Sequence, residues 1–139
     1  MENFWDKRYA GADYLFGTKP AAGLIALEPQ LVAGGKTLLV ADGEGRNSVY
    51  LASRGYDVRA TDYSQVAQVK ARVLAKEASV DVDFVLSDIY DTGWSDEAYD
   101  NVVAIFIQFV PPERMDEIFT ALARATRAGG TLLIHGYTP

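Results

Sequence analysis

Short apolar runs rich in β-branched residues alternate along the chain with longer segments in which apolar residues recur at helical spacing. That alternation is typical of a parallel sheet whose strands are joined by crossover helices. We therefore expect an α/β, Rossmann-like, doubly wound fold, with helices on both faces of a parallel sheet in strand order 3-2-1-4-5. Five strands are predicted, at residues 37–41, 57–61, 82–87, 101–107 and 131–135.

Three helices are predicted between these strands, the first at residues 46–54 and the second from Ser64 to about residue 78. Gly55 is placed to cap the C-terminus of the first helix, and the Ser64 hydroxyl to cap the N-terminus of the second. The third begins at Pro112, which suits the first turn of a helix, and ends at residues 128–130. The apolar stripes of the second and third helices are Val66, Val69 and Val73, and Ile118, Leu122 and Ala125, respectively.

The first 35 residues differ from the rest, because aromatic side chains crowd ahead of the first strand: Phe4, Trp5, Tyr9, Tyr14 and Phe16. We interpret this stretch as one or two short helices that lie over a ligand site as a lid. An equally ordinary role for these aromatics is to cover the hydrophobic end of the sheet. We expect a single domain over residues 1–139, with the lid at 1–35 and the Rossmann-like core at 36–139.

The amino-acid composition argues against several kinds of binding partner and metal site. The net charge is −6 and the 13 basic residues are scattered, which argues against a nucleic-acid or anionic-membrane surface. The lack of cysteine and the single histidine, His135, exclude thiolate and histidine-rich metal sites, so no metal is expected. The sequence contains neither a leader-like segment nor an apolar run of about 20 residues, so a cytoplasmic location is the expectation.

The sharpest functional signal is the turn after the first predicted strand, which contains Gly43 and Gly45. In open parallel sheets, ligands bind at the carboxyl ends of the strands, where glycines let the backbone approach them closely. Asp62 follows 17 positions after Gly45, at the end of the second strand, where a carboxylate can accept both hydroxyls of an adenosine ribose. Asp88 ends the third strand, near the expected place of an adenine ring. These residues predict an adenosine cofactor.

The charge of this turn discriminates between adenosine cofactors. Asp42 and Glu44 would repel the pyrophosphate of a dinucleotide such as NAD. S-adenosylmethionine has no phosphate and carries two cationic groups, a sulfonium and an ammonium, so we favour it. A dehydrogenase would also need a second domain. Two alternatives stay open at this point, namely that the carboxylates point into solvent and that Arg46 neutralises Glu44.

The same residues carry a resemblance to a known family. Residues 41–52 (ADGEGRNSVYLA), 55–58 (GYDV) and 61–64 (TDYS) resemble class I S-adenosylmethionine-dependent methyltransferases, in particular the small enzymes typified by tellurite-resistance and thiopurine methyltransferases. Residues 5–9 (WDKRY) and 14–20 (YLFGTKP) are similar to the N-terminal lid of that branch. Two positions depart from the family pattern. Leu39 replaces an acidic residue that many relatives carry, and Ala41 replaces the usual first glycine.

The resemblance implies a role for each part of the site. Gly43 and Gly45 would back the methionine part of the cofactor, Asp62 would hold the ribose, and Asp88 would face the adenine amine. The segment 106–109 would lie beside the sulfonium and the acceptor. The expected cofactor-binding residues are Ala41, Asp42, Gly43, Glu44, Gly45, Asn47, Asp62, Tyr63, Ser64, Asp88, Ile89, Ile107 and Gln108. The expected lid and acceptor residues are Trp5, Tyr9, Tyr14, Phe16, Gly17 and Phe109.

Methyl transfer from a sulfonium is a direct displacement that mainly requires alignment in a dry pocket, so no catalytic base is obligatory. The weak candidates for catalytic contacts are His135, Gln108, Tyr90 and Asp91. Polar residues at strand ends more often cap the strand. The expected function is transfer of a methyl group to a small-molecule acceptor, with S-adenosylhomocysteine as the second product. The sequence leaves the identity of the acceptor open.

The fifth predicted strand, residues 131–135, forms an apolar edge of the sheet. The family usually continues past this strand into a helix and an antiparallel hairpin, whereas this sequence ends at Pro139, so either the sequence is shortened or this edge associates. An exposed edge invites pairing with another copy, so we expect a homodimer or a strand-exchanged oligomer through this edge. The alternative function is accordingly a cofactor-binding, self-associating domain with little catalysis of its own.

Overall fold

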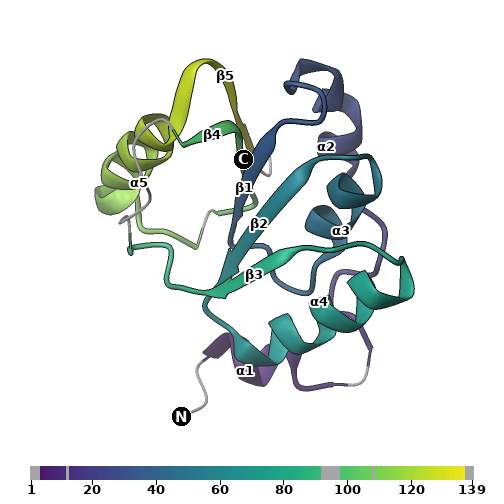
Figure 1. Ribbon diagram of the computed structural model, residues 1–139. Coiled ribbons are helices and arrows are strands. Elements are labelled where there is room, and N and C mark those ends of the chain that lie inside the picture. The colour runs from purple at the N-terminus through teal and green to yellow at the C-terminus, as the bar shows by residue number, and fades with distance from the viewer. Residues whose placement is uncertain (1–3, 12, 92–97, 108, 137–139) are drawn as a thin grey trace.

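The computed structural model describes residues 4–11, 13–91, 98–107 and 109–136, with the side chains of Phe4 and Trp5 outside that description. The strands are β1 (Lys36–Val40), β2 (Asp57–Asp62), β3 (Asp83–Leu86), β4 (Tyr99–Ile105) and β5 (Thr126–His135). They form one parallel sheet in the order β3-β2-β1-β4-β5 (Figure 1). The predicted Rossmann-like topology is thus confirmed.

Helices cover both faces of this sheet, as predicted (Figure 1). They are α1 (Phe4–Tyr9), α2 (Ala22–Leu27), α3 (Arg46–Ser53), α4 (Gln65–Glu77) and α5 (Pro112–Ala125), with a 3-10 turn η1 (Glu28–Gln30) after α2. Successive side chains of β1 point to opposite faces. Leu38 packs in a cluster with Ile118 of α5, whereas Leu39 packs with Leu24 of α2 and Leu51 of α3. In the described ranges, no helix has the length and apolar character needed to cross a membrane.

The last strand begins five residues earlier than predicted. β5 starts at Thr126, which pairs with Tyr99 of β4 before a shift in register. Gly130 permits this close pairing, because a Cβ there would lie 2.5 Å from the carbonyl oxygen of Asp100. The predicted helix end at residues 128–130 is therefore wrong, and the glycines that suggested it belong to an irregular stretch of strand.

Helix α4 buries a different side from the one predicted. Val69 and Val73 are 57% and 47% exposed, so the valine stripe does not face the core. The buried residues of the helix are Ala67, Gln68, Ala71 and Ala75. Small side chains are needed there because α4 lies against the turn after β1: a Cβ on Gly45 would come within 2.8 Å of the Ala71 Cβ. Close approach of the backbone, rather than hydrophobic spacing, decides which side faces inward.

Gly45→Ala should lower the free energy of unfolding by about 2–4 kcal/mol, because a φ of +93° disfavours a side chain and the new Cβ would collide with Ala71. Gly55→Ala is the matched control, since Gly55 has a φ of +94° but nothing within 4 Å of the added Cβ. It should cost only about 1–2 kcal/mol. Urea denaturation measures both, and equal losses would contradict a tight contact between the turn and α4.

Candidate functional site

A cavity of about 580 Å³ opens at the carboxyl ends of the strands, within the range usual for small-molecule sites. It is lined by the turn after β1, the segments that follow β2, β3 and β4, and the N-terminal segment. The expected cofactor residues in the lining are Ala41, Asp42, Gly43, Glu44, Asn47, Asp62, Tyr63, Asp88 and Ile89. The expected lid and acceptor residues in the lining are Tyr9, Phe16, Gly17 and Phe109.

Other expected site residues lie elsewhere. Gly45 contacts α4, and Ile107 is buried in the core beneath α5. Ser64 is the N-cap of α4, where its hydroxyl accepts the N–H of Ala67 at 3.1 Å. These three residues, and Tyr14, are outside the cavity lining. Gln108 and the side chain of Trp5 lie outside the described part of the chain.

The turn after β1 has three residues in the left-handed region: Ala41, Gly43 and Gly45, with φ of 53°, 64° and 93°. The first of these corresponds to the family's usual glycine. Ala41 adopts the glycine conformation nevertheless, at a cost on the order of 1–2 kcal/mol. Alanine at this position is therefore compatible with the left-handed conformation that glycine favours. Leu39, the other departure, is buried in the core between β1 and α3 and brings no charge to the cavity.

Asp62, at the end of β2, connects this turn to α4. One carboxylate oxygen accepts the N–H of Gly43 and the other accepts the N–H of Ser64, both at 2.9 Å. Burial raises the pKa of Asp62, and the backbone donors oppose that rise. Each carboxylate oxygen has a further lone pair, so a side chain in this lining position can also accept ligand hydroxyls.

Asp42 caps the N-terminus of α3. Its carboxylate accepts the Ser48 hydroxyl at 2.6 Å and the Ser48 N–H at 3.2 Å. Burial raises the pKa of Asp42 to about 7; the bonds from Ser48 work against this rise, while the negative charge of Asp62 adds to it. The group therefore titrates near neutral pH while it holds the helix terminus in place.

Glu44 is neither solvent-exposed nor paired with Arg46. Its buried carboxylate forms an ion pair with Lys70 of α4 at 2.8 Å. The other oxygen accepts the backbone N–H of Leu15 at 2.6 Å. Both alternatives left open by the sequence are thereby resolved, since Lys70 is the residue that neutralises Glu44.

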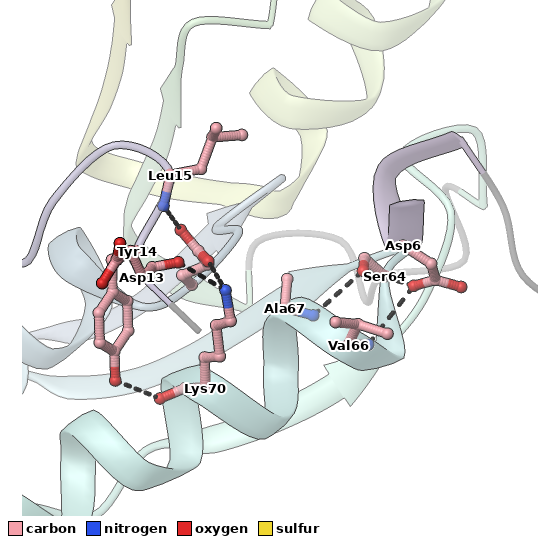
Figure 2. A network of polar contacts seen from close by, with 9 residues as sticks. Asp6, Asp13, Tyr14, Leu15, Ser64, Val66, Ala67 and Lys70 are labelled. Atoms are coloured by element: carbon pink, nitrogen blue, oxygen red, sulfur yellow. Dashed lines mark hydrogen bonds and ion pairs between the residues drawn. The ribbon is translucent and has the colours of Figure 1, made fainter. Parts of the chain in front are cut away.

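Figure 2 shows how the N-terminal segment is fastened to α4. The Tyr14 hydroxyl donates to the backbone carbonyl of Lys70 at 3.1 Å, and the Lys70 ammonium donates to the carbonyl of Asp13 at 2.8 Å. At the start of the helix, the Ser64 hydroxyl donates to Asp6 at 2.5 Å. The segment is held beside the cavity at these two places.

Tyr9 brings the N-terminal segment directly over the glycine turn. A Cβ on Gly43 would lie 2.9 Å from the Tyr9 hydroxyl oxygen, so the turn and the ring are in close contact. Burial, reinforced by the negative charges of Asp62, Glu44 and Asp42, raises the pKa of Tyr9 far above its ordinary value. The hydroxyl thus stays protonated as a hydrogen-bond donor among three carboxylates.

The turn after β3 supplies the remaining wall. Asp88 lines the cavity, and one of its carboxylate oxygens accepts the N–H of Tyr90 at 2.9 Å. Tyr90 also lines the cavity, and its ring centroid lies 3.7 Å from the guanidinium carbon of Arg114. Among the catalytic candidates in the described ranges, Tyr90 faces the cavity and Asp91 is not part of its lining.

His135 is likewise outside the cavity lining. Its ring lies 5.3 Å from that of Phe106, and a Cβ on Gly23 would come within 2.4 Å of its Nε2 atom. The side chain is thus packed between α2 and the end of β4. No group of three or more potential metal ligands occurs among the described residues.

Several lining residues were not expected from the sequence: Arg8, Arg46, Ser87 and Ile105. Arg8 and Arg46 belong to the WDKRY and GEGRN runs that carry the family resemblance. Their position inside those runs was a signal that they face the site, whereas nothing in the sequence distinguished Ser87 or Ile105 from ordinary strand-end residues.

Comparison with known proteins identifies the family. A family model described as "Methyltransferase domain" matches residues 38–130. The chain is 36% identical over 109 residues to hemagglutinin 1 of Eikenella corrodens, covering 76% of this chain and 35% of that protein. It is 26% identical over 134 residues to the probable S-adenosyl-L-methionine-dependent methyltransferase TehB of Haemophilus influenzae, covering 96% and 44%. The chain thus spans less than half the length of these two relatives.

Solved structures agree with this match. One similar structure was reported as "Conversion of a Disulfide Bond into a Thioacetal Group during Echinomycin Biosynthesis". It superposes on this chain with a TM-score of 0.81 and is 29% identical in sequence. The match covers 96% of this chain and 60% of that one. The family match runs from within β1 to within β5 and includes the glycine turn, Asp62 and Asp88. The chain therefore belongs to the class I S-adenosylmethionine-dependent methyltransferases, a family whose cofactor is S-adenosylmethionine.

Proposed function

We propose that this protein transfers the methyl group of S-adenosylmethionine to a small-molecule acceptor by direct displacement. The observation that carries the proposal is one cavity that combines the glycine turn, the Asp62 carboxylate and a wall of phenylalanine side chains. The first two suit an adenosine cofactor, and the third suits a reaction that needs a dry site.

The polar lining fits the parts of this cofactor. Asp62 retains acceptor capacity for ribose hydroxyls, and Asp88 stands one strand further along, on the side expected for adenine. Asp42, once ionised, places a negative charge near the cationic methionine part. When bound, S-adenosylmethionine supplies an electrophilic methyl group on its sulfonium. The protein's own task is then to align the acceptor and exclude water.

The apolar lining supports a small acceptor. Phe16 comes from the N-terminal segment, whereas Phe106 and Phe109 follow β4, so rings from both sides face the same space. Cofactor and acceptor have to share a cavity of about 580 Å³. A compact acceptor fits that constraint better than a segment of protein or nucleic acid.

Asp62→Ala should weaken S-adenosylmethionine binding by about 100-fold or more, because each hydrogen bond to a charged group contributes about 1.5–3 kcal/mol and two hydroxyls lose their acceptor. Asp57→Ala, at the exposed opposite end of β2, is the matched control and should bind normally. Calorimetry gives the affinities, and thermal unfolding checks that both variants fold. Wild-type affinity in Asp62→Ala would mean that another group holds the ribose.

S-adenosylmethionine binding should tighten as the pH rises from about 6 to about 8. Asp42, with a pKa of about 7, is neutral below that pH and negative above it, and only the ionised form attracts a cationic ligand. The effect is at most about tenfold per pH unit below the pKa. Asp42→Asn keeps an acceptor for Ser48 but cannot ionise, so its affinity should change less. An identical pH dependence in both proteins would assign the titration to another group.

Release of S-adenosylhomocysteine tests the function itself. The protein is incubated with S-adenosylmethionine and, in turn, small thiols, amines, carboxylates and metalloid oxyanions, and the product is measured by chromatography. We expect release with at least one class, and none with unrelated protein or RNA. Cofactor binding without release in every class would instead support the alternative, a self-associating binding domain, which light scattering would reveal as a dimer.

A further inference from the structure

The guanidinium of Arg46 lies between two aromatic rings. Arg46 is the first residue of α3, directly after the glycine turn. Its guanidinium carbon is 5.7 Å from the ring centroid of Phe16 and 6.0 Å from that of Phe106. One ring comes from the N-terminal segment and the other follows β4, so the cation stands where these two parts of the wall meet. All three residues line the cavity.

Arg46 forms no salt bridge with the residues that the structure describes. Its charge opposes the rise that burial causes in the pKa of the nearby Asp42, but the Asp42 carboxylate is hydrogen-bonded to Ser48. Lys70, by contrast, is paired with Glu44. Aromatic rings attract a guanidinium through its charge and leave its in-plane N–H donors unused. The donors of Arg46 are therefore available to an anion that enters the cavity.

The neighbours of Arg46 also indicate which half of the cavity it serves. The residues suited to adenosine, Asp62 and Asp88, follow β2 and β3, on one side of β1. Phe106 follows β4, on the opposite side of β1. Arg46 therefore stands in the half of the cavity left for the acceptor.

The charges of the cofactor and of the cavity lining also indicate that Arg46 serves the acceptor. S-adenosylmethionine has two cationic groups and a single carboxylate, and two guanidinium groups, those of Arg8 and Arg46, line the cavity. Arg8 precedes Tyr9, whose hydroxyl lies close to Gly43 of the glycine turn. One carboxylate is matched by one guanidinium in a bidentate pair. One carboxylate cannot form such a pair with both guanidinium groups, and Arg46 is the one beside Phe106, in the half of the cavity left for the acceptor.

We propose that Arg46 binds an anionic oxygen group of the methyl acceptor, a carboxylate or a chemically similar oxyanion. This inference rests on the proposed methyl transfer and adds the charge of the substrate to it. The anionic group is a binding group separate from the nucleophile of the acceptor. A guanidinium paired with the nucleophilic atom itself would engage the electron pair that has to attack the methyl carbon. Arg46 is thus a residue that positions and selects the acceptor.

In the transfer, a lone pair of the acceptor's nucleophile forms the new bond to the methyl carbon. The carbon–sulfur bond breaks with both electrons remaining on sulfur, which becomes a neutral thioether. A proton on the nucleophile, if present, passes to water. The anionic group keeps its charge throughout, so its pairing with Arg46 holds the acceptor in line without changing during the reaction.

The test uses probe pairs that differ in the anion: 3-mercaptopropionate against 3-mercaptopropionamide, and β-alanine against β-alaninamide. Each is titrated by calorimetry into the whole chain saturated with S-adenosylhomocysteine, so the result does not depend on turnover. We expect the acid of at least one pair to bind about tenfold or more tightly than its amide, as a charged hydrogen bond predicts. Arg46→Met should lose that preference, and Arg46→Lys should recover part of it.

Arg72→Met is the matched control, because Arg72 also lies over a phenylalanine ring, 5.3 Å from the centroid of Phe84, but does not line the cavity. It should keep the acid preference. Equal binding of acid and amide in both pairs, or an unchanged preference in Arg46→Met, would overturn the assignment. So would a tenfold loss of S-adenosylmethionine affinity in Arg46→Met with the acid preference retained, because Arg46 would then serve the cofactor's carboxylate.

Failure of the proposed function gives a different result. A wild-type protein that binds S-adenosylmethionine but releases no S-adenosylhomocysteine with any acceptor would refute methyl transfer. The acid preference and its loss in Arg46→Met would still be measured in that protein, since the titration requires binding only.

Discussion

The carboxylate of Asp62 holds the turn after β1 and the start of α4 together. Its two oxygens accept the N–H groups of Gly43 and Ser64, in buried surroundings where an unpaired donor costs about 1–3 kcal/mol. The left-handed glycine, the helix cap and the carboxylate that faces the cavity therefore depend on the same atoms. Under the proposed function, the carboxylate that would accept the ribose hydroxyls is the same one that holds the turn and the start of α4 together.

The other acidic residues near the turn are also structural. Asp42 bonds to Ser48 at the start of α3, and Glu44 pairs with Lys70 while accepting the N–H of Leu15. Neither carboxylate is free, so the two do not attract a cationic cofactor simply as exposed charges, contrary to the expectation from sequence. The electrostatic attraction of the cavity for a cationic ligand depends on what fraction of these buried carboxylates is ionised. The same contacts attach the N-terminal segment to the core, so the charge of the turn and the wall above it are linked.

The half of the cavity beyond β1 is built differently. Phe106 follows β4 with a φ of 56°, a conformation that costs about 1–3 kcal/mol and persists where the surrounding structure enforces it, as for Ala41 in the glycine turn. The strained turn at Phe106 is held by its N–H bond to the carbonyl of His135, at 2.7 Å. The centroid of the Phe106 ring lies 6.0 Å from the Arg46 guanidinium carbon, so a main-chain constraint contributes to the surroundings of that side chain.

The sequence by itself determined the alternation of strands and helices, the glycine turn and the position of Asp62, because apolar periodicity and the ends of parallel strands are local properties with a fixed geometric consequence. The strand order followed from the Rossmann-like fold that this alternation and the glycine turn indicated. The tertiary structure decided the features that depend on contacts between segments far apart in the sequence. It turned Val69 outward, paired Glu44 with Lys70, and enclosed Arg46 between two rings. Backbone proximity and the burial of charge set these outcomes, and neither is encoded in spacing along the chain.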